Sequence, residues 1–210
     1  MSPSFEPSSV IHPTLHHFGV ETRHLEPMLE WYGKVVGMVT VGSTAPGWGS
    51  AVGMPAAASF VSNDRAHHRM AIFEVPQLQE DTDKGAHVKL QHVAFEYATL
   101  DDLLTSYVRI KTLGIEPVLT MDHGPTIAFY YQDPDRNSVE LFADTFGDWD
   151  QSRQFTQSSP EFHLNPMGTP VDADQLVAAR QAGMSSAELH QRAYAGEFQP
   201  ARPVDTRVLL

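Results

Sequence analysis

The sequence contains no cysteine, which excludes a disulfide scaffold, a thiolate metal site and a cysteine nucleophile. Cationic residues are scarce, since 14 Lys and Arg stand against 26 Asp and Glu for a formal net charge of -12. We therefore expect no binding to nucleic acid or to an anionic membrane surface. No apolar run is long enough to cross a bilayer, and the first ten residues show no charged-then-apolar leader pattern. The prediction is a soluble cytoplasmic protein.

Histidine is abundant, with eleven among 210 residues. Imidazole is the commonest metal ligand in proteins, and its protonation changes near neutral pH. Most single histidines lie on the surface, so a position within a pattern is needed to identify a functional one. The hydrophobic share of 41% is sufficient for the core of one domain.

A repeat with an offset of 75 residues organises the chain. Residues 15–32 align without a gap on residues 90–107, and His17 falls on His92. Each copy begins with an alternating run that is typical of a strand. Apolar residues at three- and four-residue steps follow, as expected of a helix. An internal repeat of this kind indicates two structural modules.

Each copy is predicted to fold as β-α-β-β-β, so the fold class is α+β with two paired modules. Gly37 and Gly114 are expected to end the two helices. A turn-forming run at 133–137 predicts a hairpin between the last two strands. The predicted strands are 17–22, 39–41, 58–61 and 70–75 in the first copy, and 92–97, 117–120, 126–132 and 138–143 in the second.

A C-terminal arm follows the repeat, and we expect it to cover the site or to form a subunit contact. Residues 147–168 are expected to be irregular. One helix should begin after Asp172 or Asp174, and another after Ser185 or Ser186. The predicted boundaries are 1–13 for an N-terminal extension, 14–146 for the domain with modules 14–75 and 88–146, and 147–210 for the arm.

Three residues are candidates to bind one metal ion. His17 and His92 hold equivalent positions at the start of equivalent strands, which a pseudo-two-fold axis can bring together. Glu140 lies in an apolar strand, where a carboxylate is costly unless it is paired or metal-bound. Two histidines and one carboxylate form the ligand set of non-haem Fe(II) oxygenases. His16 could replace His17 as the ligand, but it aligns with Gln91 in the repeat. The alternative to a metal site is that all three candidates are ordinary hydrogen-bonded or solvent-facing side chains.

These features resemble the vicinal oxygen chelate superfamily, which includes glyoxalases, bleomycin- and fosfomycin-resistance proteins and type I extradiol dioxygenases. The resemblance covers residues 14–146 and implies paired βαβββ modules that form a curved mixed sheet around a metal site. The superfamily places its metal ligands on the first strand of each module and on the last strand of the second. Those positions match His17, His92 and Glu140 in this chain.

Two segments are similar to the extradiol branch. Residues 63–71 resemble an N-x-R-x-H-H-x-x-A segment with one inserted residue, which implies that His68 lies beside bound O₂. Residues 122–140 resemble an H-G…Y…D-P-x-G-N…E signature. This signature implies an acid–base role for His123 and a contact between Tyr130 and a substrate hydroxyl.

The second segment departs from the pattern of the branch at two places. The interval from His123 to Tyr130 is two residues shorter than in two-domain members, so Tyr131 is the alternative tyrosine. Arg136 stands where the family usually has glycine, and the residue in that turn should tolerate positive φ.

The resemblance implies extradiol ring cleavage, in which both atoms of O₂ enter a catechol. Fe(II) is the expected metal, with Mn(II) as the alternative. The expected substrate is a small aromatic diol, of the biphenyl type or otherwise substituted, and the expected assembly is a homo-oligomer. The aromatic candidates to line an apolar pocket are Trp48, Phe95, Phe129, Phe146 and Phe155.

Two other functions remain open from the sequence. The first is a glyoxalase-like lyase, isomerase or epimerase, which would use Glu74 as a fourth protein ligand. The second is a non-catalytic resistance protein that sequesters its ligand, a class that generally lacks the metal triad.

Overall fold

The computed structural model describes residues 10–45, 48–51 and 57–205. The first nine residues of the expected N-terminal extension and the last five residues of the arm lie outside these ranges. The chain divides into two compact units. Unit one comprises residues up to Leu25 together with Met38–Leu78, and unit two comprises Glu26–Gly37 and Gln79 onward.

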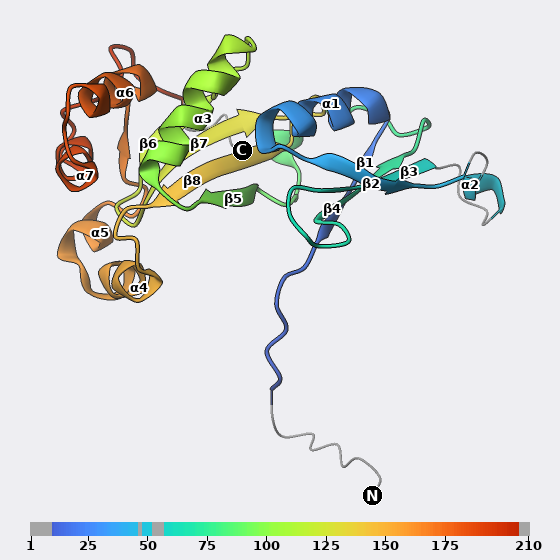
Figure 1. The fold of residues 1–210 in the computed structure, drawn as a ribbon, viewed down its shortest axis with the longest axis horizontal. Helices are drawn as coiled ribbons and strands as arrows, with labels where there is room; N and C mark the ends of the chain where they lie inside the picture. The colour runs from blue at the N-terminus through green and yellow to red at the C-terminus, as the bar shows by residue number, and fades with distance from the viewer. Residues whose placement is uncertain (1–9, 46–47, 52–56, 206–210) are drawn as a thin grey trace, which may run out of the picture. The chain divides into compact units, whose positions relative to one another are not determined.

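Unit one holds a four-stranded mixed sheet in the order β1-β4-β3-β2 (Figure 1). β1 runs parallel to β4, while β3 is antiparallel to both β4 and β2. The strands are β1 (Phe18–Thr22), β2 (Val39–Ser43), β3 (Ala57–Ser62) and β4 (Met70–Glu74), and a short helix α2 (Trp48–Ala51) precedes β3.

Unit two repeats this topology and extends it. Its sheet has the order β5-β8-β7-β6-β9, in which the first four strands correspond one by one to those of unit one. The predicted α+β fold with two βαβββ modules is therefore confirmed. The strands are β5 (Val93–Tyr97), β6 (Leu119–Asp122), β7 (Thr126–Gln132), β8 (Ser138–Asp144) and β9 (Thr169–Pro170), the last of which comes from the arm.

The module helices are α1 (Leu25–Val36) and α3 (Leu100–Thr112). The Thr99 side chain accepts a hydrogen bond from the main-chain N–H of Asp102 at 3.1 Å, which caps α3. Both helices are followed by a glycine at positive φ, 74° at Gly37 and 76° at Gly114, as the sequence predicted.

Helix α1 precedes unit one's second strand but clusters with unit two. The buried Tyr32 hydroxyl donates to the Asp133 carboxylate over 3.1 Å. The Arg109 guanidinium of α3 donates to the main-chain carbonyls of Lys34 and Val35. Asp133 also accepts hydrogen bonds from the main-chain N–H groups of Asp135 and Asn137 in the 133–137 turn. The same carboxylate therefore binds both α1 and this turn.

The arm is more regular than expected. Two helices, α4 (Trp149–Ser158) and α5 (Pro160–Leu164), occupy a segment predicted to be irregular. That prediction is wrong because capping by Asp148 and Ser159, together with contacts of the Phe155 ring with the rings of Phe146 and Tyr194, offsets the polar composition of these helices. The expected later helices are present as α6 (Ala173–Gln181), capped by Asp172, and α7 (Ser186–Tyr194), capped by Ser185.

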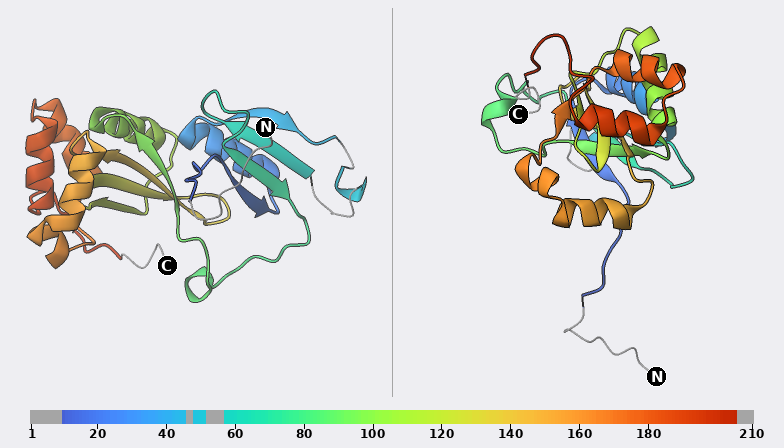
Figure 2. Two further views of the ribbon diagram at one scale, coloured as in Figure 1. Left: turned by 90° about the horizontal axis from the view of Figure 1, so that it is seen from below. Right: turned by 90° about the vertical axis from the view of Figure 1, so that its left-hand side faces the viewer.

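Figure 2 shows the arm helices, in orange and red, gathered at one end of unit two's sheet. Two ion pairs join α6 to α3. A guanidinium nitrogen of Arg180 lies 2.6 Å from a carboxylate oxygen of Asp101. The ammonium nitrogen of Lys111 lies 2.6 Å from a carboxylate oxygen of Asp174. Among the described residues, no helix has the length and apolarity that crossing a bilayer requires.

Candidate active site

The two faces of unit two's sheet differ in chemistry. Successive side chains of a strand point to opposite faces. The Phe129 ring lies 5.4 Å from the Tyr107 ring of α3, so Phe129 and Tyr131 belong to the core beneath that helix. Tyr130 therefore lies on the other face, together with its register partner Glu140. We call this second face the site face.

His92 and Glu140 meet on the site face. Nε2 of His92 lies 2.9 Å from a carboxylate oxygen of Glu140, whose side chain is only 9% exposed. Hydrogen bonding to Glu140 raises the pKa of His92 above its ordinary value. Nδ1 of His92 contacts the Gln91 amide oxygen, so the ring is held from both sides.

This pair is suited to a divalent metal. Two ligand atoms in neighbouring coordination positions, each about 2.1 Å from the ion, lie about 3 Å apart, as these two atoms do. Imidazole and carboxylate are ligands of the borderline class that suits Fe(II) or Mn(II). Within the described residues, neither unit gathers three such ligands alone. The third predicted ligand, His17, belongs to unit one.

Tyr130 and His123 form a second pair on unit two. The Tyr130 hydroxyl lies 2.8 Å from Nε2 of His123. Burial, with the Glu140 carboxylate as the next contribution, raises the pKa of Tyr130 well above its usual range. Tyr130 consequently stays protonated as a hydrogen-bond donor. Four predicted residues, His92, Glu140, Tyr130 and His123, thus lie in one continuous chain of contacts.

Tyr131, the alternative tyrosine, is on the opposite face. Its side chain is fully buried, and its hydroxyl has no hydrogen-bond partner among the described residues. Register therefore separates the two tyrosines, which the sequence left open.

Unit one contains a cluster of four histidines. The rings of His17 and His68 lie 4.3 Å apart, so the two site residues predicted in this unit are adjacent. His16 stacks on His67 at 4.5 Å. Burial and the neighbouring imidazoles lower the pKa of His68. Arg69 secures the cluster by donating to the main-chain carbonyl of His16.

Three other predicted residues have clear structural surroundings. A carboxylate oxygen of Glu74, the candidate fourth ligand, accepts from the main-chain N–H of Leu25 over 3.4 Å. Arg136 adopts a φ of 62°, the left-handed conformation expected for the turn. Phe129, expected to line a pocket, instead belongs to the core beneath α3.

Sequence reasoning missed three residues around His123. Nδ1 of His123 lies 2.8 Å from the main-chain carbonyl of Met167. The preceding residue, Asp122, is fully buried and lies 2.8 Å from Nδ1 of His190. Burial raises the pKa of Asp122 even though His190 opposes the shift. Neither His190 nor Met167 belongs to the repeat, so periodicity could not identify them.

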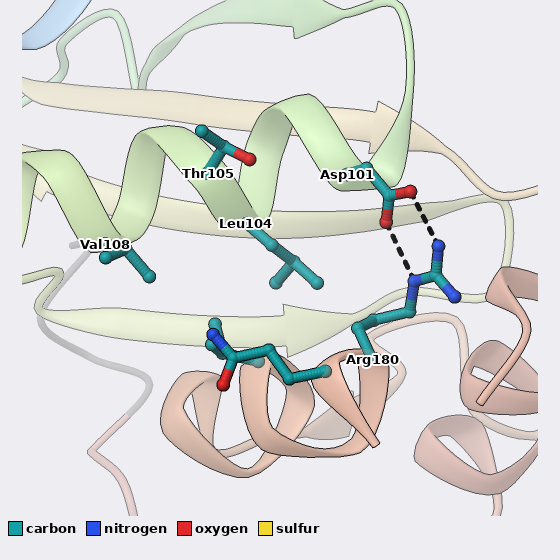
Figure 3. Close-up of a pocket in the computed structure, with 7 residues that line it drawn as sticks. Asp101, Leu104, Thr105, Val108 and Arg180 are labelled. Carbon is teal, nitrogen blue, oxygen red and sulfur yellow. Dashed lines mark hydrogen bonds and ion pairs between the residues drawn. The ribbon is translucent and has the colours of Figure 1, made fainter. Parts of the chain in front are cut away.

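A separate groove lies between α3 and α6, with a volume of about 460 Å³ (Figure 3). Leu104 and Val108 line it, and Arg180 spans it to form hydrogen bonds with both carboxylate oxygens of Asp101. None of the predicted site residues lines this groove. It does not belong to the candidate active site.

Comparison with known proteins identifies the family of this chain. The chain matches the Glyoxalase/Bleomycin resistance protein/Dioxygenase superfamily over residues 14–141, and it belongs to this superfamily. It is 35% identical over 183 residues to biphenyl-2,3-diol 1,2-dioxygenase 3 of Rhodococcus globerulus, covering 87% of this chain and 90% of the relative. Biphenyl-2,3-diol 1,2-dioxygenase 2 of the same organism is 34% identical over 191 residues, which cover 91% of this chain and 94% of that relative.

A solved structure has the same fold. The glyoxylase/bleomycin resistance protein/dioxygenase domain from Frankia sp. EAN1pec superimposes with a TM-score of 0.54. It covers 64% of this chain and 93% of its own length, at 14% identity. More than a third of this chain therefore has no counterpart in that domain.

Proposed function

We propose that this protein is an extradiol dioxygenase that cleaves a catechol ring with O₂, using Fe(II) bound by His17, His92 and Glu140. The contact chain from His92 through Glu140 and Tyr130 to His123 is the observation that carries the proposal. In this chain of contacts an imidazole and a carboxylate that could bind a metal ion lie next to a phenol and a second imidazole. The likeness to two biphenyl-2,3-diol 1,2-dioxygenases over about nine-tenths of their length supports the same reaction type.

The polar groups of this site suit a catechol. The protonated Tyr130 hydroxyl can donate a hydrogen bond to one oxygen of a substrate diol. Nε2 of His123 can accept the proton of a substrate hydroxyl and later return it to the product. His68 is proposed to interact with O₂, on the basis of the sequence resemblance.

The site face continues into an apolar cluster. Tyr130 packs with Leu119, Met121 and Ala128, and Phe142 borders the group. An apolar surface next to a few polar groups favours an aromatic substrate over a small polar one. A biphenyl-type diol is the proposed substrate class.

The metal would be held by the facing atoms of His92 and Glu140, with His17 as the third ligand. A bound Fe(II) would supply Lewis acidity that lowers the pKa of a catechol hydroxyl and a redox couple for reaction with O₂. Mn(II) accepts the same ligands and is the proposed substitute.

Substrate-dependent O₂ uptake tests this function. The protein is loaded anaerobically with Fe(II), mixed with 2,3-dihydroxybiphenyl or simpler catechols, and exposed to air while O₂ and visible absorbance are followed. We expect one O₂ per catechol and a coloured ring-opened product. The variants His92→Ala and Glu140→Ala should lose bound iron and at least about 10²-fold in kcat, since they remove ligands directly.

The matched control is His24→Ala, because His24 is an exposed histidine of unit one without a counterpart in the repeat. This variant should keep both its iron and its activity. Absence of O₂ uptake across the catechol panel, with one ferrous ion per chain verified, would overturn the proposal. The next test would then be Glu74→Ala in assays for lyase and isomerase activity.

A further inference from the structure

We propose that the C-terminal arm sets the protonation form of His123: the Met167 carbonyl holds the proton on Nδ1 and leaves Nε2 free to act as a base. This inference rests on the proposed function for its catalytic consequence. The geometry of His123 and of its neighbours in the arm supports it independently.

The partners of His123 define its tautomer. A main-chain carbonyl can only accept a hydrogen bond, so Nδ1, 2.8 Å from the Met167 oxygen, must carry the hydrogen. In the neutral ring Nε2 then has only a lone pair. This lone pair can accept from the Tyr130 hydroxyl, 2.8 Å away, until that hydroxyl donates to a substrate oxygen instead. A base at Nε2 is thereby ready to receive a substrate proton.

Glycine at position 168 makes this contact possible. Gly168 has a φ of 76°, and a Cβ there would lie 2.0 Å from the Asp122 carbonyl oxygen and 2.6 Å from the His123 Cα. Both of these atoms are main chain, so they cannot yield as a flexible side chain would. Asn165 closes the turn by donating from its side chain to the Gly168 carbonyl over 2.7 Å. The arm is therefore pressed against the backbone of His123.

The role of Met167 is confined to its main chain. Its side chain is exposed, at 58% of the residue surface, while its carbonyl meets the imidazole. This explains why side-chain patterns in the sequence do not identify the contact.

His190 of α7 fixes the residue before His123. The Asp122 carboxylate receives a hydrogen bond from the Gly124 N–H at 2.9 Å and pairs with Nδ1 of His190 at 2.8 Å. A buried carboxylate without such partners would be strongly unfavourable. The residues on both sides of His123 are thus tied together, and α7 supplies one of the ties. His190 and Gly168 are positioning residues, because they act through His123.

The test is a long-range ¹H–¹⁵N correlation spectrum of the imidazoles in the full-length chain without iron. We expect the wild-type His123 ring, assigned by loss of its signals in His123→Gln, to carry its proton on Nδ1. Gly168→Ala should shift the ring toward a mixture of tautomers. The matched control is Gly147→Ala. It introduces a side chain at a similar φ, 66°, but there a Cβ would meet no atom of the described residues within 4 Å.

A second pair of variants covers the case in which Gly168→Ala does not fold. His190→Leu should lower kcat by about tenfold or more with little change in KM, a loss within the range of acid–base catalysis. His190→Gln keeps an N–H donor for Asp122 and should recover most of that loss.

A wild-type ring protonated on Nε2 would overturn the inference. So would folded Gly168→Ala and His190→Leu proteins with unchanged tautomer and unchanged kcat. The spectrum needs no substrate or iron, so an Nδ1 proton in a protein without dioxygenase activity would support the role of the arm while removing the proposed function.

Discussion

Strand register decides which of two adjacent tyrosines lies on the site face. Tyr130 contacts His123 on the site face, whereas the Tyr131 hydroxyl is buried beneath α3 with no hydrogen-bond partner in the described part of the chain. Both are aromatic residues of one strand, β7, and nothing in their local sequence separates them. The separation follows from the alternation of side chains along the strand.

We expect Tyr130→Phe to lower kcat for catechol cleavage by about 10²-fold, the usual scale for a positioned proton-transfer group. Tyr131→Phe should leave kcat unchanged and the protein equally or slightly more stable, because a buried hydroxyl without a partner contributes no hydrogen bond. Steady-state O₂ uptake and urea unfolding measure the two effects. Equal losses of kcat in both variants would show that the assignment from register is wrong.

At the level of the secondary-structure elements, ion pairs join the arm to α3. The Arg180 guanidinium lowers the pKa of Asp101, and the Lys111 ammonium lowers the pKa of Asp174. Both carboxylates are largely exposed, so each pair contributes only about 0–1 kcal/mol. Because the folded-state pKa values are lowered, this contribution is present above the unfolded pKa near 3.9 and is lost as pH falls through the folded values.

The double variant Asp101→Asn with Asp174→Asn should therefore be less stable than wild type by about 0–2 kcal/mol at pH 7. The difference should shrink as pH falls below about 4. Urea unfolding at pH 7, 5 and 3 measures it. A difference that stays constant across this range would show that charge is not the cause.

On the scale of the whole chain, α1 connects two parts of the sequence that the repeat keeps separate. Its helix belongs to the first repeat, yet Tyr32 bonds to Asp133 of the second. Asp133 is 3% exposed and also organises the turn between β7 and β8. The β8 strand that follows this turn carries Glu140.

Tyr32→Phe should lower the free energy of unfolding by about 1 kcal/mol, the net value of one hydrogen bond. Tyr131→Phe is the matched control, since it removes a buried tyrosine hydroxyl for which the described residues offer no hydrogen-bond partner. Urea unfolding compares the two, and hydrogen exchange should show faster exchange in α1 of the first variant only. Equal stability of both variants would contradict the anchoring role of Asp133.

Much of the fold was predictable from local patterns. The 75-residue repeat predicted two βαβββ modules, and the two sheets have matching strand orders. Gly37 and Gly114 end their helices at positive φ, and the turn places Arg136 in the left-handed region. These features depend on residues that are close together in the sequence, so the local pattern of residue types is enough to predict them. Helices α4 and α5 were missed because their sequences are polar and because one ring that Phe155 contacts, Tyr194, lies far along the chain.

The candidate site was predictable only in part, because some of its contacts join segments that lie far apart in the sequence. Equivalent positions in the repeat selected His17 and His92, and an isolated carboxylate in an apolar strand selected Glu140. The contacts from Met167 and His190 to the His123 region span 44 and 68 residues. One uses a main-chain carbonyl, which every residue possesses, and the other a histidine outside the repeat. Such contacts arise from packing between distant segments, so folding, rather than local pattern, places them beside the His123 imidazole.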